Sequence, residues 1–178
     1  MRCLERLPPE RITARAIATE AGANLASIAY HFGSKDALVT EAVIEGLDRW
    51  VAEIDRGLAD LRSEDPAARF RRAAEVFEKT RRRHAGLAAN LVGALAKAQH
   101  DPRVRELLSN GYQGTRPDIA SLLGLGADRA AGDAAGLLVA MFHGLLFQTL
   151  LDPGLAIEGR RMERAQARLR RVLPDHAE

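Results

Sequence analysis

The sequence of 178 residues predicts an all-α protein. Apolar residues recur at spacings of three and four along most of the chain, and no stretch alternates at the period of two that is typical of a strand. Ala, Leu, Arg and Glu, which favour helix, are abundant, while aromatic residues make up only 4%, so the core must be mainly aliphatic. Helix-breaking residues divide the chain into segments of helical length: Pro8, Gly22, Gly33, Pro66, Pro102, Gly124 and Pro153.

The composition is that of a folded domain without a strong charge preference. Apolar residues make up 47% of the chain, which is too much for extended disorder, and the formal net charge is only +2. Residues 1–60 contain seven basic and ten acidic side chains, so charge alone gives no reason to expect nucleic acid there. A DNA-binding function must therefore be argued from a motif.

The chain has one cysteine, Cys3, and no apolar N-terminal stretch suited to secretion. A single cysteine cannot form an internal disulfide, and it matches no metal-binding motif. We therefore expect a protein of the reducing cytoplasm, with no metal and no cofactor.

Two short helices come after the proline pair near the N-terminus. Thr13 is a good N-cap for a helix over 13–20, and Gly22 can adopt the left-handed conformation that ends helices. Asn24 is a similar N-cap for a second helix over 25–31. The pattern is therefore helix, tight turn, helix.

A third, long helix follows Ser34, a good N-cap, and is expected to end near residue 62. Asp36 suits the positive first turn of this helix. Five further helical stretches are expected over 66–83, 85–100, 103–123, 128–151 and 156–172.

Two short helices around a glycine turn match a DNA-binding helix-turn-helix, but many helical proteins contain such a pair for structural reasons alone. Ala18 and Ala21 allow a close crossing, and Ile17 and Ile28 can fill the space between the helices. Spacing alone leaves both interpretations open.

The residues themselves are more specific. The run ITARAIATEAGANLASIAYHFGSKDALVTEAV resembles the helix-turn-helix of the TetR family of bacterial transcriptional regulators, over about residues 10–50. Its most specific segment, Tyr-x-Phe-x-x-Lys-x-x-Leu, is formed by Tyr30, Phe32, Lys35 and Leu38. Beyond this region only the number and order of helices agree with the family.

The resemblance implies which residues contact double-stranded DNA. Those that would face base edges are Asn24, Leu25, Ala26 and Ser27. Those that would contact the DNA backbone are Thr13, Tyr30, His31 and Lys35. Alternative interpretations stay open: Tyr30 capping a small core, His31 as a solvated helix end, Lys35 as a surface charge and Asn24 as an N-cap only.

The resemblance also implies a DNA-binding head over 1–50 and a ligand-binding and dimerisation domain over 51–178. In the family another helix precedes the motif, whereas here residues 1–7 offer only a turn or two, with Leu4 and Leu7 as core positions. Either the start lies upstream or the first helix is incomplete. In a truly short chain we expect Ile12, Ile17, Ile28 and Phe32 to lose their cover, which would weaken DNA binding.

Residues 134–151 form the most apolar segment, just long enough for a membrane span. Polar interruptions such as His143 argue against a span, and the resemblance implies instead that helices near 128–172 pack against a second copy of the chain. A homodimer would read a palindromic operator. The small residues that would allow close helix approach are Ala135, Gly136, Ala140 and Gly144.

Helices from about 66 onward are expected to enclose the small-molecule effector site that family members use. Its candidate lining is Phe70, Phe77, Leu91, Tyr112, Phe142 and His143, although aromatic residues at helical spacing are more often plain core. The arginine runs 69–72 and 81–83 are expected to form solvated faces.

No phosphate loop, metal-ligand cluster or nucleophile motif is present in the sequence, so catalysis is not expected. The favoured function is a ligand-responsive DNA-binding transcriptional regulator, a repressor released from its operator by a small molecule. The alternative is a helical dimerisation or ligand-binding protein whose shortened head no longer binds DNA.

Overall fold

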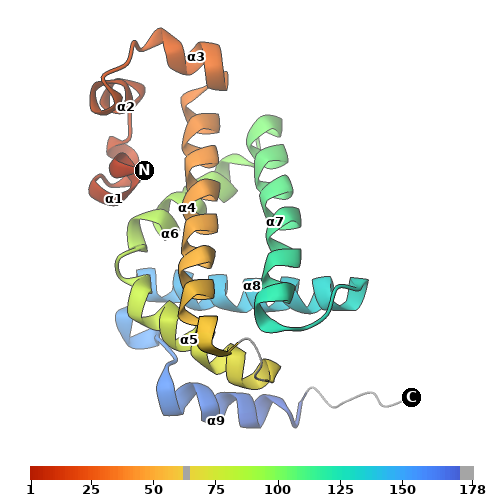
Figure 1. Cartoon of the computed structure of the whole chain (residues 1–178). Helices are drawn as coiled ribbons and strands as arrows, with labels where there is room; N and C mark the ends of the chain where they lie inside the picture. Colours follow the sequence, from red (N-terminus) through yellow and green to blue (C-terminus); the bar gives the residue numbers. More distant parts are fainter. Residues whose placement is uncertain (62–64, 173–178) are drawn as a thin grey trace.

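The computed structural model describes residues 1–61 and 65–172, which form nine α-helices, three short 3-10 helices and no strand (Figure 1). The all-α prediction is therefore confirmed. The elements are α1 Arg2–Arg6, η1 Pro9–Arg11, α2 Ala14–Ala21, α3 Ala26–Phe32, α4 Lys35–Gly57, η2 Ala59–Leu61, α5 Pro66–Arg81, α6 Ala85–Lys97, α7 Pro102–Leu123, α8 Arg129–Leu151, η3 Pro153–Leu155 and α9 Gly159–Leu169. Helices α1 to α3 lie toward one end of the long helix α4 (Figure 1). Helices α5, α6 and α7 pack against α4, and α8 packs against α6 and α7.

Local capping contacts fix the boundaries of the head helices. The Thr13 Oγ1 accepts a hydrogen bond from the Ala16 amide at 3.1 Å, and Gly22 ends α2 with φ 61°. The Ser34 Oγ accepts from the Ala37 amide at 3.0 Å and begins α4. These three predictions are confirmed, because each rests on a contact between residues close in sequence.

Several predicted boundaries are wrong by a few residues. Helix α4 ends at Gly57 rather than near 62, because the backbone turns away at Leu58 into η2; residue 62 itself lies outside the described residues. Helix α9 begins at Gly159 rather than near 156, because Ala156 and Glu158 have non-helical backbone angles, with ψ of 129° and 163°. Helix α6 ends at Lys97, three residues before the predicted end.

The first helix is short, but it covers the helix-turn-helix. Leu4 is buried, as are Ile12 and Ile28, while Ile17 and Phe32 are half-buried. The expectation that these side chains lose their cover is therefore wrong for Ile12 and Ile28. The cover comes partly from the helical domain after the head, here called the body, because α1 and η1 both pack against α6 of that domain.

Glycine makes the contact between α1 and α6 possible. A Cβ placed on Gly86 would lie 2.3 Å from the backbone oxygen of Leu4, which is closer than real Cβ atoms come to backbone. One hydrophobic cluster then connects the head residues Leu4 and Ile12 to Val43 and Leu87.

Helix α4 runs unbroken through residue 50, where the sequence predicted the division between the two domains. The chain therefore has no break in its secondary structure at that residue.

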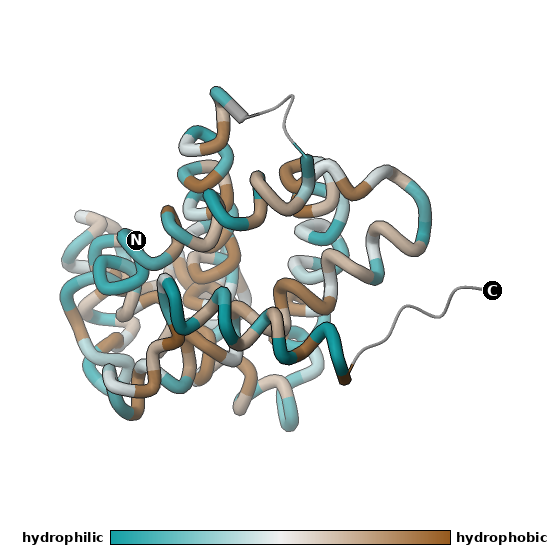
Figure 2. The backbone as a smooth tube through the Cα atoms, turned by 90° about the horizontal axis from the view of Figure 1, so that it is seen from below, coloured by the Kyte–Doolittle hydropathy of each residue, from teal (hydrophilic) through white to brown (hydrophobic). Residues whose placement is uncertain are grey.

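Helix α8 is largely unburied within a single chain. Leu137 is 75% exposed and Leu151 is 84% exposed. Among the described residues α8 is the one helix long and apolar enough to cross a membrane, which alone is weak evidence for a span. In the view from below, α9, which leads to the C-terminus, is mainly hydrophilic (Figure 2).

Candidate DNA-contacting surface and central cavity

Helix α3 presents its outer face at the end of the molecule farthest from α9 (Figure 1). The Tyr30 side chain is 84% exposed and Leu25 is 48% exposed, whereas Ile28 is buried on the other side of α3, which packs against α4. Asn24, Ala26 and His31 are also exposed. This pattern leaves one face of α3 open for a partner and uses the other for packing.

Two of the predicted DNA contacts have a second, structural role. The Thr13 hydroxyl caps α2, and the Asn24 side chain accepts a hydrogen bond from the Ala26 amide at 2.9 Å. Asn24 is nevertheless not the N-cap that the sequence predicted, because α3 begins at Ala26, one residue later than predicted, with Leu25 as its N-cap. Ser27 is half-buried and so offers less of its side chain than its neighbours.

Lys35 and Asp36 form an ion pair at the start of α4, with 2.9 Å between the Lys35 Nζ and the Asp36 Oδ1. Lys97, the last residue of α6, contacts the same carboxylate oxygen. Partial burial opposes ionisation of Asp36, but the hydrogen bonds from Lys97 and Lys35 outweigh it and hold the pKa of this carboxyl below its usual value. The predicted phosphate-contacting lysine is thus linked to the body of the protein.

A central cavity lies between α4, α5, α6, α7 and α8. The space open to the centres of water molecules is about 110 Å³, enough for a small organic molecule or several waters. Five of the six predicted lining residues surround it, namely Phe77, Leu91, Tyr112, Phe142 and His143. Phe70 does not; it lines a neighbouring groove.

Sequence reasoning missed the contribution of α4, which lines this cavity with six residues, among them Trp50 and Asp48. Trp50 stacks on Phe77, with ring centroids 4.9 Å apart, and its indole nitrogen donates to the Thr80 hydroxyl at 2.7 Å. Asp48 is the one acidic residue of the lining. Trp50 belongs to the apolar stripe of α4, and Asp48 lies at its edge, so only the tertiary structure shows that both face a cavity.

The polar groups of the cavity are few and differ in character. The Tyr112 hydroxyl and the His143 Nδ1 form a hydrogen bond of 3.0 Å. Burial raises the pKa of Tyr112 and lowers that of His143, so both are neutral near pH 7. Burial also raises the pKa of Asp48, with further contributions from Glu45 and Asp118.

Asp48 has no hydrogen bond or ion pair with any other described residue. Aromatic rings and a carboxylate without a cation together favour a positively charged molecule with apolar substituents. Within residues 1–61 and 65–172, no three His, Cys, Asp or Glu side chains are placed to hold a metal ion.

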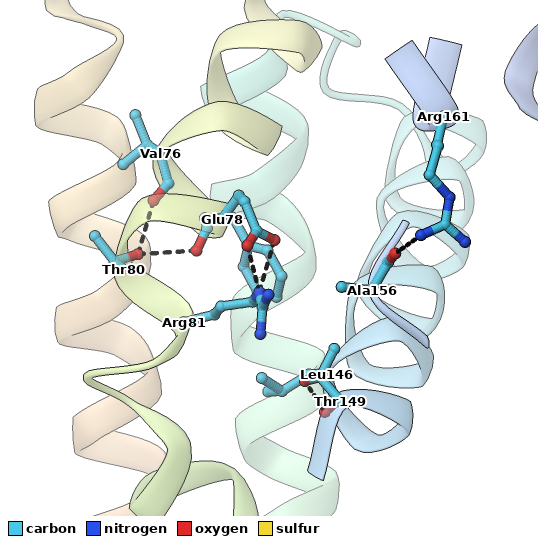
Figure 3. Close-up of polar contacts among 9 residues, drawn as sticks. Val76, Glu78, Thr80, Arg81, Leu146, Thr149, Ala156 and Arg161 are labelled. Carbon is cyan, nitrogen blue, oxygen red and sulfur yellow. Dashed lines mark hydrogen bonds and ion pairs between the residues drawn. The ribbon is translucent and has the colours of Figure 1, made fainter. Parts of the chain in front are cut away.

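The sequence predicted that the arginine runs 69–72 and 81–83 form solvated faces, and this prediction is wrong for Arg69 and Arg81. Arg69 is buried and donates to the Ser121 carbonyl at 3.1 Å, near the C-terminal end of α7, where a positive charge is favourable. Arg81 is buried beside Glu78, with 2.6 Å between Nε and Oε1 (Figure 3). Their neighbours Arg71, Arg82 and Arg83 are exposed.

Comparison with known proteins gives the same assignment for both halves of the chain. Residues 1–42 match the profile of bacterial regulatory proteins of the tetR family, and residues 66–177 match that of the C-terminal domain of BetI-type transcriptional repressors. A transcriptional regulator from Saccharomonospora viridis, crystallised in complex with choline, is 25% identical with a TM-score of 0.53, over 91% of this chain and 87% of that one. No protein of curated function matches the chain in sequence.

A helix-turn-helix head, joined by a long helix to a helical domain with a central cavity, defines a ligand-responsive DNA-binding transcriptional regulator. The chain belongs to the TetR family. The family resemblance inferred from the motif around Tyr30 and Lys35 is therefore confirmed.

Proposed function

We propose that this regulator is a homodimeric cytoplasmic repressor, released from a palindromic operator by a small organic cation of the choline type. The observation that carries the proposal is the carboxylate of Asp48, which is exposed, has no hydrogen bond or ion pair with another described residue, and borders a mainly aromatic and aliphatic cavity. The choline bound to the similar regulator from Saccharomonospora viridis supports the same ligand class.

The cavity offers what a quaternary ammonium ion requires. Such an ion has no hydrogen to donate, so it is recognised by aromatic faces and by charge. Rings from α4, α5, α7 and α8 surround the space: those of Trp50, Phe77, Tyr112 and Phe142. A bound cation would also remove the repulsion among Asp48, Glu45 and Asp118 that opposes ionisation of Asp48.

Choline binding is measured through Trp50, which is the single tryptophan of the chain and lines the cavity. We expect choline to change its fluorescence, while the neutral carbon isostere of choline binds much more weakly. Asp48→Asn is expected to weaken choline binding by about tenfold, or about 1.4 kcal/mol. Asp60→Asn, at an exposed carboxylate outside the cavity, is the matched control.

A second titration measures DNA binding and its response to choline. Fluorescence anisotropy on DNA that flanks the gene is expected to show specific binding that choline reverses, with random DNA as the control. Choline that tightens DNA binding would contradict release from the operator. Equal choline affinity of the Asp48→Asn variant and the unchanged protein would contradict the assigned cation site.

The dimer is proposed from the exposed apolar face of α8, which a second copy would cover. Gly144 permits a clean test, because a Cβ there would meet nothing within 4 Å in the single chain. Gly144→Leu should therefore leave the fold intact but disturb the interface. Analytical ultracentrifugation should show weaker self-association, and a dimer of unchanged affinity would contradict an interface at this position.

A further inference from the structure

A groove separate from the central cavity lies between α5, α8 and α9. Its space open to the centres of water molecules is about 350 Å³, larger than that of the central cavity. Apolar side chains that line it include Phe70, Ala74, Leu145 and Met162. Charged residues of α5 and α9 lie on its other parts, among them Glu78 and Arg81, which pair with each other (Figure 3).

Four aromatic rings connect the two spaces. Trp50 lines only the central cavity and Phe70 lines only the groove, whereas Phe77 and Phe142 line both. The ring centroids follow one another at 4.9 Å from Trp50 to Phe77, 4.9 Å from Phe77 to Phe142 and 5.8 Å from Phe142 to Phe70. Phe77 and Phe142 therefore form an aromatic partition between cavity and groove.

The two rings of the partition are not held equally. Phe77 is buried and stacks on Trp50, which is itself fixed by its hydrogen bond to Thr80. Phe142 is half-buried on α8, a helix with few buried residues. Phenylalanine in a helix has two common side-chain directions, so Phe142 is the ring that can turn aside.

We propose that the cavity and groove form one two-part binding site, which accepts an organic cation bearing a linear apolar chain. The cationic head lies beside Asp48 in the central cavity, as the proposed function requires, and this inference rests on that function. The chain passes Phe142 and lies in the groove against Ala74, Leu145 and Met162. The site thus selects cations by chain length as well as by charge.

The probes are alkyltrimethylammonium ions of increasing chain length, from tetramethylammonium to octyltrimethylammonium, with Trp50 fluorescence as the readout. Choline must displace each ion, which ensures that binding occurs in the cavity rather than on the exposed face of α8. Once the chain passes Phe142, we expect the dissociation constant to fall by about fourfold for each methylene buried.

Variants of the groove separate its contribution from that of the cavity. Met162→Ala removes part of the groove wall and should weaken the octyl ion several-fold while tetramethylammonium binding stays the same. Met141→Ala, at a half-buried methionine that lines neither space, is the matched control. Ala74→Phe fills the groove and should end the dependence on chain length; its thermal unfolding shows whether it is folded.

The outcomes distinguish this inference from the proposed function. If choline and tetramethylammonium bind in an Asp48-dependent way but longer chains bind no more tightly, the two-part site is overturned and the proposed function stands. Equal effects of Met162→Ala and Met141→Ala on the octyl ion would also overturn it. If no ammonium ion binds at all, both proposals fail.

Discussion

The candidate DNA-contacting surface and the central cavity place their candidate functional side chains in opposite surroundings. In the head, Tyr30 is 84% exposed on a helix of seven residues that is fixed by its neighbours in sequence. Around the cavity, Phe77 and Leu91 are buried, and the wall needs five helices that are distant in sequence. The contact surface therefore depends on where a short helix begins and ends, whereas the cavity depends on the packing of all five helices that line it.

Helix α6 connects these two regions. Leu91 lines the cavity, Gly86 lies against the backbone of α1, and Lys97 contacts Asp36 at the start of α4. A shift of α6 would therefore move the head through two contacts, one at each end of α6: Gly86 against α1 and Lys97 against Asp36. An effector that binds more tightly when α6 is in the position unsuited to DNA binding lowers the DNA affinity by the ratio of its two affinities. DNA lowers the effector affinity by the same factor.

The largest effect is expected from Gly86→Ala, which would break the connection between head and body. The new methyl group would overlap the Leu4 carbonyl oxygen, and this backbone atom cannot move aside as a flexible side chain would. We expect a loss of about 1–3 kcal/mol in the free energy of unfolding, measured by urea titration, together with weaker DNA binding.

Gly93→Ala is the control for this prediction, because it lies in the same helix and a Cβ there would meet nothing within 4 Å. Alanine is favoured over glycine within helices, so Gly93→Ala should be neutral or stabilise the fold by up to about 1 kcal/mol. Similar destabilisation by both substitutions would show that the contact between α1 and α6 is not the cause.

The next effect concerns the head alone. Tyr30→Ala and Lys35→Ala should each weaken DNA binding by about tenfold, without changing choline affinity or self-association. Lys35→Ala should also reduce the salt dependence of DNA binding, because one fewer counterion is released. Tyr30→Phe keeps the ring and tests the hydroxyl. Unchanged DNA affinity in both alanine variants would remove these residues from the contact surface.

How far the sequence predicts the structure differs between the same two regions. Thr13, Gly22 and Ser34 set helix ends through contacts with residues at most four positions away, so the head could be predicted closely. The burial of Arg69 and the position of Asp48 on the cavity wall could not, because they depend on α7 and on packing between helices. The aromatic residues indicated a cavity, but only the bundle separates Phe70 from it.

The smallest effect is expected at Lys97, where head and body share a charge. Lys97→Met leaves Asp36 to Lys35 alone, which should hold that lysine away from phosphate and weaken DNA binding by only a few-fold, since partly exposed ion pairs contribute less than about 1 kcal/mol. Choline affinity should stay the same. Lys79→Met, at an exposed lysine of α5, is the matched control.

A double-mutant cycle separates this coupling from a direct contact of Lys97 with DNA. Once Asp36→Asn has removed the shared carboxylate, Lys97→Met should no longer change DNA affinity, because Lys97 acts only through Asp36. An equal loss with and without Asp36 would mean that Lys97 reaches the DNA itself. The cycle therefore decides whether the end of α6 belongs to the contact surface or to the connection between head and cavity.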